Sequence, residues 1–317
     1  MPEFITIGET CAVLVSKDVG RMRYNKEFEI KPGGAESTVA VGVRRLGHSS
    51  GWISQLGEDE FGFYLLSLIR GEGIDVSQVN IIPNKQTGIF FRERLPGGEA
   101  RNFYYRTGSA FSEISSESIK ENYIASAKVL HITGISPALS KSCSKMIKFA
   151  IEIAKKHKTL VTFDPNMRLK LWKAEEARQI MENLMISADY VLPSYEDLQA
   201  IYGEKMAEKE VIKHLQEIGC KHIIIKLGIK GAILSLPSGN EIISGYPIEN
   251  PVDLMGAGDA FVAGFISGIL KDMTLRESVN LANIVASLSI KLPGNIESLP
   301  TWDEVIRFKK KGNYIKR

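Results

Sequence analysis

The stretch Asp253-Leu254-Met255-Gly256-Ala257-Gly258-Asp259-Ala260-Phe261 places a glycine turn and a carboxylate at the start of an apolar segment. The glycines allow a tight turn, so the helix expected to begin near Ala257 can direct unpaired N–H groups at an anion such as a triphosphate. Asp259 falls in the first turn of this helix, where it can accept a proton from an attacking hydroxyl. The stretch therefore predicts a phosphoryl-transfer site.

An ordinary helix start is the simpler explanation of the same residues. Small residues would form the turn, and an acidic residue in the first turn interacts favourably with the helix dipole. The rest of the chain has to decide between the two interpretations.

Composition limits the classes of protein. Of 317 residues, 44% are hydrophobic, and the net charge of +3 is too small and dispersed to indicate a nucleic-acid partner. No apolar run approaches the roughly 20 residues of a membrane span, and the first residues lack the layout of a signal peptide, so we expect a cytoplasmic protein without a membrane partner. Cys11, Cys143 and Cys220 are widely spaced, which favours packing roles over disulfides or a zinc site.

Strands and amphipathic helices alternate from about residue 128 onward, which is the pattern of parallel βαβ units. This alternation predicts an α/β fold with a mainly parallel sheet, helices on both faces and ligands at the carboxyl ends of the strands. Asp164, Ser194 and Lys226 end or follow such strands, so we expect polar chemistry there. The expected strands are 129–132, 159–163, 190–192 and 222–226, and the expected helices are 146–156, 175–186, 195–202 and 208–218.

Two stretches interrupt this alternation. Short strand-like runs at about 11–31 and about 87–106 predict a small, discontinuous β-sheet lid, in which Pro96-Gly97-Gly98 supplies a hairpin turn. No long linker or repeat separates the segments, so we expect residues 1–317 to form a single domain. Exposed edges of the lid strands can pair between subunits, and a homo-oligomer formed through the lid is therefore expected.

Two more glycine segments extend the argument. Gly33-Gly34-Ala35-Glu36-Ser37 precedes an expected helix at 38–46, and Gly57-Glu58-Asp59-Glu60-Phe61-Gly62 follows the next strand. Together with the stretch 253–261, they resemble the signatures of the ribokinase-like, or PfkB, family of carbohydrate kinases over nearly the whole chain.

This resemblance implies the cofactors and the catalytic groups. ATP would be the phosphoryl donor and Mg²⁺ would bridge its phosphates, while dependence on a monovalent cation stays open. Asp259 would be the base, and the amides of Gly256, Ala257 and Gly258 would stabilise the transferring group. Gly33 and Gly34 would lie against the sugar hydroxyls.

Two segments indicate which kind of sugar the protein binds. Asp164-Pro165-Asn166-Met167-Arg168 places an acid, an amide and a guanidinium at alternate positions, which share one face if the segment is extended. Its Asp-x-Asn-x-Arg pattern, and the run Phe103-Tyr104-Tyr105-Arg106, resemble segments of family members that act on 2-keto-3-deoxygluconate. The resemblance implies that Arg106 and Arg168 grip the carboxylate of this acid sugar. A mixed-polarity surface loop and cross-strand aromatic packing are the alternatives.

The same resemblance places further residues around the sugar. Tyr104 and Tyr105 belong to the substrate strand, but successive strand residues face opposite sides, so one of them must pack across the strands instead. Phe90 stands where these relatives carry a tyrosine. Asn295, in a loop after Pro293-Gly294, is expected on the substrate side.

Lys226-Leu227-Gly228-Ile229-Lys230-Gly231 resembles the family's nucleotide segment, although a strand followed by a glycine hairpin is the alternative. Ser194-Tyr195-Glu196-Asp197 stands in place of an Asn-x-x-Glu element, which implies that Asp197 contacts Mg²⁺ through water. The residues implied on the nucleotide side are Asn166, Arg168, Ser194, Lys226, Gly228, Gly231, Gly256, Ala257, Gly258 and Asn283.

We therefore expect an ATP-dependent kinase that phosphorylates the 6-hydroxyl of 2-keto-3-deoxygluconate. A kinase of a neutral sugar, such as fructose, ribose or a nucleoside, is the nearer alternative, because its ATP side would look the same. A non-catalytic sugar-binding protein of the same fold is the more distant one. The sequence leaves open the configuration at the sugar's C4, so the galactonate form is also a candidate substrate.

Overall fold

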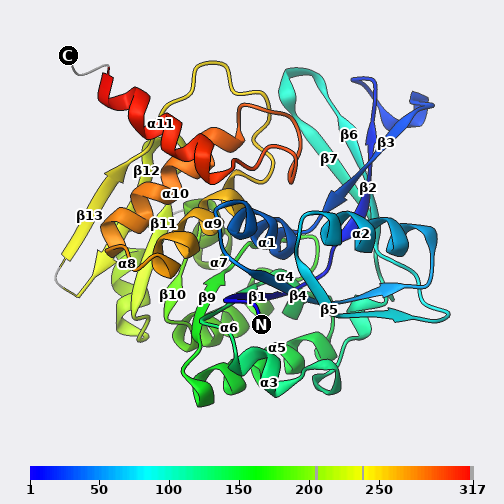
Figure 1. The fold of residues 1–317 in the computed structure, drawn as a ribbon, viewed down its shortest axis with the longest axis horizontal. Coiled ribbons are helices and arrows are strands. Elements are labelled where there is room, and N and C mark those ends of the chain that lie inside the picture. Colours follow the sequence, from blue (N-terminus) through cyan, green and yellow to red (C-terminus); the bar gives the residue numbers. More distant parts are fainter. Residues whose placement is uncertain (204–205, 238, 315–317) are drawn as a thin grey trace.

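A nine-stranded sheet forms the centre of the computed structural model, which describes residues 1–203, 206–237 and 239–314. Its strands are β1 (Phe4–Ile7), β4 (Ser50–Gly57), β5 (Asp75–Ile82), β8 (Val129–Thr133), β9 (Leu160–Asp164), β10 (Tyr190–Val191), β11 (His222–Lys226), β12 (Gly231–Leu236) and β13 (Gly239–Ser244). Their order is β13-β12-β11-β10-β9-β8-β1-β4-β5 (Figure 1). Neighbours from β11 to β5 are parallel, and only β12 and β13 pair antiparallel among the described strands, so the predicted mainly parallel sheet is confirmed.

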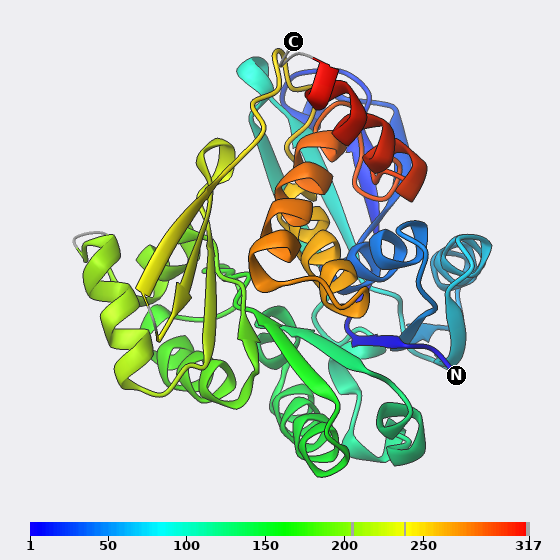
Figure 2. The same ribbon diagram turned by 60° about the vertical axis from the view of Figure 1, so that its left-hand side comes forward.

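Helices cover both faces of this sheet, as predicted (Figure 2). One face packs against α1 (Ala35–Arg45), α2 (Glu60–Gly71), α9 (Ala257–Leu270), α10 (Leu275–Ser289) and α11 (Trp302–Tyr314). The other face packs against α3 (Glu121–Ala125), α5 (Lys141–His157), α6 (Ala174–Ser187), α7 (Tyr195–Tyr202) and α8 (Glu208–Glu217), while the short α4 (Ile135–Leu139) follows β8.

The sheet separates two hydrophobic cores because side chains alternate along each strand. On β11, Ile223 and Ile225 enter the core under α5 to α8, whereas Ile224 enters the core under α9 and α10. All three isoleucines are buried, so the strand is apolar on both sides, as expected for a strand covered by helices on both faces.

Local sequence sets the ends of the helices. In α5, Cys143, Met146, Ile147 and Ala150 recur at helical spacing and are buried. The hydroxyl of Ser140 accepts a hydrogen bond from the Cys143 amide at 3.0 Å and caps the helix. This cap starts α5 at Lys141, five positions before the predicted start at residue 146, because polar residues of its first turn gave no apolar signal.

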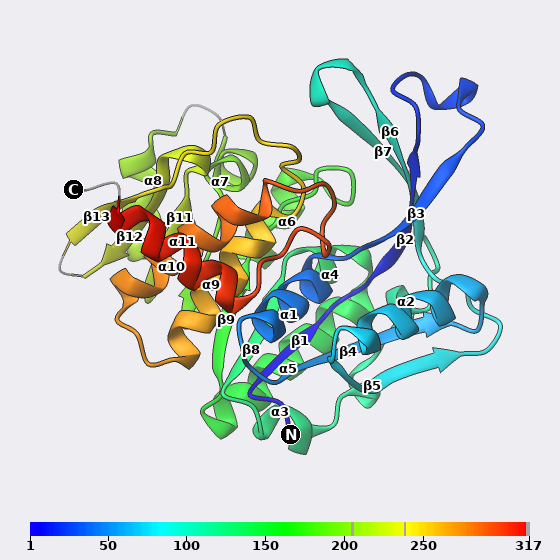
Figure 3. The same cartoon turned by 45° about the horizontal axis from the view of Figure 1, so that its top comes forward.

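A second, four-stranded sheet forms the lid (Figure 3). Its strands are β2 (Cys11–Ser16), β3 (Phe28–Gly33), β6 (Ile89–Arg94) and β7 (Ala100–Tyr105), in the order β3-β2-β6-β7. The hairpins β2–β3 and β6–β7 are antiparallel, and β2 joins them by pairing parallel to β6. The predicted turn at Pro96–Gly98 connects β6 to β7. The lid is thus built from the two stretches that interrupt the βα alternation.

Two other expectations concern single residue types and helix length. Cys11, Cys143 and Cys220 are all free and buried, in agreement with packing roles. Within the described ranges, no helix combines the length and the apolar character that crossing a membrane requires.

Candidate active site

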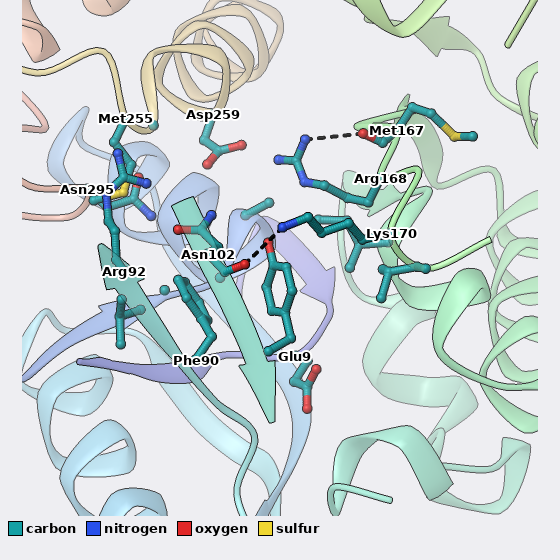
Figure 4. Close-up of a pocket in the computed structure, with 18 of the residues that line it drawn as sticks. Glu9, Phe90, Arg92, Asn102, Met167, Arg168, Lys170, Met255, Asp259 and Asn295 are labelled. Carbon is teal, nitrogen blue, oxygen red and sulfur yellow. Dashed lines mark hydrogen bonds between the residues drawn. The ribbon is translucent and has the colours of Figure 1, made fainter. Parts of the chain in front are cut away.

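A cavity of about 710 Å³ lies between the lid and the carboxyl ends of the central strands. Its wall includes Asp259 and Gly256 from the start of α9, Arg168 from the loop after β9, and Tyr104 and Arg106 from the lid (Figure 4). The other predicted site residues in this wall are Gly33, Gly34, Phe90, Ser194, Asp197 and Asn295. Segments far apart in the sequence therefore share one pocket.

The start of α9 presents the groups expected of an anion site. Gly256 has a left-handed backbone with φ of 75°, and a Cβ there would lie 2.0 Å from Oδ1 of Asn295, so only glycine fits. Ala257 donates its amide to the Leu254 carbonyl oxygen at 3.3 Å. Within the described chain, the amides of Gly258 and Asp259 have no acceptor, and these two N–H groups are open to a ligand.

The carboxylate of Asp253 holds this turn in place. It accepts hydrogen bonds from the amides of Met255, at 3.0 Å, and Gly294, at 3.2 Å. The turn before α9 is thereby fixed to the loop that carries Asn295. Positioned amides need no reorganisation when charge develops on a phosphoryl group.

Asp259 lies half-buried at the pocket wall. Burial and the nearby negative charge of Asp164 raise its pKa to about 7, although Lys226 and Arg168 act in the opposite direction. Figure 4 shows the Asp259 carboxylate and the Arg168 guanidinium on opposite sides of the same space. A carboxylate with a pKa near neutrality is suited to accepting a proton.

This raised pKa predicts the pH dependence of the reaction. Below pH of about 7 the Asp259 carboxyl is protonated and cannot act as a base, so kcat/KM should fall about tenfold per pH unit toward acid and level off above the pKa. Initial rates measured between about pH 5 and pH 9 would check this. A profile that stays flat from about pH 6 to pH 8 would contradict a base with this pKa.

Three polar residues meet at the carboxyl ends of the strands, as their strand-end positions predict. Asp164 ends β9, Lys226 ends β11, and Ser194 forms an isolated parallel bridge to Lys226. The Lys226 ammonium donates to Asp164 Oδ2 at 2.5 Å in a buried ion pair. A Cβ on Gly258 would lie 3.8 Å from the Lys226 nitrogen, so this cation sits beside the start of α9.

The expectation that Asp164, Asn166 and Arg168 share one face is wrong. Asn166 has a left-handed backbone with φ of 39°, and its amide donates to Asp164 Oδ1 at 3.1 Å, so the chain turns instead of staying extended. Asp164 and Asn166 are buried, and only Arg168 reaches the cavity. The Arg168 guanidinium donates to the Met167 carbonyl oxygen at 3.3 Å.

On the lid, the alternation of side chains separates the two tyrosines. Tyr104 lines the pocket and packs against Phe90, with ring centroids 5.2 Å apart. Tyr105 is 63% exposed on the opposite face, where it packs edge-on against Phe91. The assignment of Tyr105 to the substrate is therefore corrected, since it points away from the pocket.

Arg106 reaches the pocket but already has an acidic partner. Its guanidinium donates through Nε to Glu9 Oε2 at 2.7 Å and also contacts that oxygen through Nη2. Ser109 donates to the other oxygen of Glu9 at 2.5 Å. Both members of this ion pair are largely buried, so Glu9 offsets the charge of Arg106 at the base of the lid.

Asp197 has a structural partner set at the start of α7. Its Oδ2 accepts from the amide and the hydroxyl of Ser194, at 2.9 and 2.7 Å, and its Oδ1 accepts from the Met167 amide at 2.7 Å. This capping box fixes the loop after β9 to α7. Among the described residues, no group of three or more His, Cys, Asp or Glu side chains is arranged to hold a metal directly.

The two asparagines predicted near the ligands lie in different places. Asn295 lines the pocket, donates to the Thr38 hydroxyl at 2.8 Å, and leaves its buried Oδ1 without a partner in the described part of the chain. Asn283 lies outside the pocket wall and donates to the carbonyl oxygens of Ile243 and Ser244 on β13. Gly228 lies in the β11–β12 connection and Gly231 is the first residue of β12, and both are outside this wall.

Sequence reasoning did not assign several pocket residues. Glu36, in the first turn of α1, is buried and accepts hydrogen bonds from Thr133 and Ser136, and burial raises its pKa. Arg92 also lines the cavity, and the period-two alternation from Phe90 would have placed it there. Other polar residues of the wall that sequence reasoning missed are Glu9, Arg101, Asn102, Lys170 and Glu196.

The site combines a base, open helix amides and cations, and the comparisons with known proteins agree with this chemistry. A model of the pfkB family of carbohydrate kinases matches residues 1–302. The chain belongs to the pfkB carbohydrate kinase family. As a pfkB-family member it is an ATP-dependent sugar kinase, and an intact Asp259 and glycine turn agree with that activity.

Relatives of this pfkB-family kinase act on different sugars by name. The 2-dehydro-3-deoxygluconokinase of Bacillus subtilis is 31% identical over 98% of both chains. A probable chloroplastic fructokinase of Arabidopsis thaliana is also 31% identical, over 88% of this chain and 74% of its own. 2-Dehydro-3-deoxygluconate is another name for 2-keto-3-deoxygluconate.

Solved structures match the whole kinase. An uncharacterised sugar kinase from Pyrococcus horikoshii in complex with ATP has a TM-score of 0.84 and 32% identity, over 96% of this chain and 97% of that one. A ribokinase from Thermotoga maritima has a TM-score of 0.82 at 22% identity, over 98% and 100%. The predicted ribokinase-like fold is thus confirmed, with its mainly parallel sheet and smaller β-sheet lid.

Proposed function

We propose that this kinase transfers the γ-phosphoryl group of ATP to the 6-hydroxyl of 2-keto-3-deoxygluconate. The observation that carries the proposal is that Asp259, Arg106 and Arg168 line one cavity. An acid sugar needs a base at its reacting hydroxyl and cations at its carboxylate, and a guanidinium pairs well with a carboxylate. The 2-dehydro-3-deoxygluconokinase of Bacillus subtilis, which matches along the whole chain, supports the same substrate.

In this proposal, Asp259 accepts the proton of the 6-hydroxyl as that oxygen attacks. The amides at the start of α9 donate to the transferring phosphoryl group, with Gly258 and Asp259 supplying the open donors and Gly256 shaping the turn. Lys226, beside Gly258, adds a positive charge on the nucleotide side. Gly33, Gly34, Tyr104 and Asn295 form the wall against which the sugar lies.

The nucleotide would lie on the side of the pocket formed by the start of α9 and the ends of the central strands. Bound Mg²⁺ would offset the negative charge of the phosphates. Mg²⁺ retains several waters in proteins, and Asp197 in the pocket wall would hold the ion through one of them. Asn166, Ser194, Gly228, Gly231 and Asn283 are the remaining residues proposed on this side.

A kinase of a neutral sugar is the second candidate. The identity to a probable fructokinase equals that to the acid-sugar kinase, at 31%, although it covers 88% instead of 98% of this chain. The pairing of Glu9 with Arg106 also favours it, because it removes one net positive charge from the pocket.

A panel of sugars separates these candidates. With purified protein and ATP in a coupled assay, we expect kcat/KM for 2-keto-3-deoxygluconate to exceed that for fructose by at least about a hundredfold, because a neutral sugar offers no carboxylate to the Arg168 guanidinium in the pocket wall. The panel includes 2-keto-3-deoxygalactonate, ribose and a nucleoside. Equal rates on fructose would favour the neutral-sugar kinase. If no sugar is phosphorylated, the alternative of a non-catalytic sugar-binding protein would be favoured instead.

A further inference from the structure

Lys170, in the loop after β9, contacts the lid directly. Its ammonium group donates a hydrogen bond to the backbone carbonyl oxygen of Asn102 on β7, at 2.9 Å. The same nitrogen lies 6.0 Å from the centroid of the Tyr104 ring. Figure 4 shows this side chain extending from the loop to the lid strand, and Lys170, Asn102 and Tyr104 all line the cavity.

Unlike Arg106, and like Arg92, Arg101 and Arg168 of the same wall, Lys170 has no salt-bridge partner among the described residues. Its contact from the loop after β9 across to the lid sets it apart from those three arginines. Arg106 is paired with Glu9, and Lys226 is paired with Asp164. Within the described part of the chain, no carboxylate lies within salt-bridge distance of Lys170, and its contact with Asn102 is to a neutral carbonyl oxygen. The charge of Lys170 is therefore not offset by the protein.

A second cation lies close to the same ring. The guanidinium carbon of Arg106 is 5.8 Å from the Tyr104 centroid, so both cations lie near the same ring. Because Glu9 already offsets the charge of Arg106, the charge of Lys170 is the one near this ring that an anionic ligand would offset. A neutral sugar would not offset it.

We propose that Lys170 is a specificity-determining residue of this pocket. Its ammonium group binds the substrate carboxylate and at the same time connects the loop after β9 to the lid. This inference rests on the proposed function and deepens it. An ammonium group has three N–H donors, of which Asn102 takes one, and two remain for a carboxylate. Because the contact joins lid and loop, Lys170 would hold the acid sugar at the boundary between these two segments.

Removing this charge tests the inference. Lys170→Met should raise the KM for 2-keto-3-deoxygluconate by about tenfold or more, because a charge-assisted hydrogen bond is lost, while the KM for ATP changes less than about twofold. Lys170→Arg keeps the charge and should recover most of the affinity. Lys148→Met removes an exposed lysine of α5 outside the pocket wall and serves as the matched control with unchanged kinetics.

A pair of competitive inhibitors separates charge recognition from a purely mechanical link. D-Gluconate and D-glucitol have the same carbon chain, but only gluconate carries a carboxylate. Lys170→Met should weaken inhibition by gluconate and leave that by glucitol unchanged. Equal weakening of both, or a wild-type KM for the keto acid in this variant, would overturn the inference. Failure of the wild-type enzyme to phosphorylate the keto acid would overturn the proposed function instead.

Discussion

Replacing Asp259 by Asn lowers turnover at least about a hundredfold, because an amide cannot accept the proton of the attacking hydroxyl and general-base assistance contributes on the order of 10² to 10⁴ in rate. The substitution keeps the size of the side chain, and the open amides at the start of α9 belong to the backbone. ATP binding is therefore expected to persist. Steady-state rates and nucleotide titration of the variant provide the two measurements.

Thermal unfolding supplies the control for this variant. Burial raises the pKa of Asp259, which means that the folded protein disfavours the charged form that predominates above pH of about 7. A neutral Asn removes this cost, so the variant should unfold at the same or a higher temperature than the wild type at alkaline pH. Near-normal turnover would exclude Asp259 as the base, and a large drop in unfolding temperature would point to misfolding.

Replacing Lys226 by Met lowers the free energy of unfolding by about 3–5 kcal/mol, because it leaves the buried carboxylate of Asp164 without its counter-ion. The ion pair has 11% and 2% exposed side chains and a 2.5 Å contact, so water cannot replace the lost ammonium. Equilibrium denaturation measures the change. Turnover should also fall, since the cation beside Gly258 is lost.

Two further variants make this second prediction specific. Lys221→Met breaks a comparable pair with Asp189, but Lys221 is 57% exposed, so it should cost about 1 kcal/mol or less. Adding Asp164→Asn to Lys226→Met removes the unpaired charge and should recover part of the lost stability. If Lys226→Met and Lys221→Met lower the free energy of unfolding by the same amount, burial does not make the Lys226–Asp164 pair more important for stability than an exposed pair.

Much of the fold could be predicted because hydrophobic periodicity reports burial directly. Continuous apolar runs such as that ending at Lys226 indicated strands covered on both faces, and the structure places them in the centre of the sheet. Strand ends then indicated where polar residues gather, which brought Asp164, Ser194 and Lys226 together. Helix starts were less accurate, as in α5, because capping residues are polar and lie outside the apolar pattern.

The contents of the site were only partly predictable, since they depend on contacts between distant segments. Glu9 and Arg106 are 97 positions apart, and nothing in either local pattern shows that one neutralises the other. The expected alternation fails at Asn166, because its backbone is left-handed and its amide donates to the Asp164 carboxylate. The contact between Lys170 and Asn102 involves a backbone carbonyl, which no residue type encodes.

In the proposed function, the turn before α9 performs the chemistry, and residues of the lid and of the loop after β9 select the sugar. The turn before α9 tolerates no side chain at Gly256 and is anchored by Asp253, so it resists change. Phe90, Arg92 and Tyr104, in contrast, project from lid strands that carry none of the phosphoryl-transfer groups. Redesign of the lid can thus redirect this enzyme toward new acceptors, and a mutant library should diversify these inward positions while residues 253–259 are held constant.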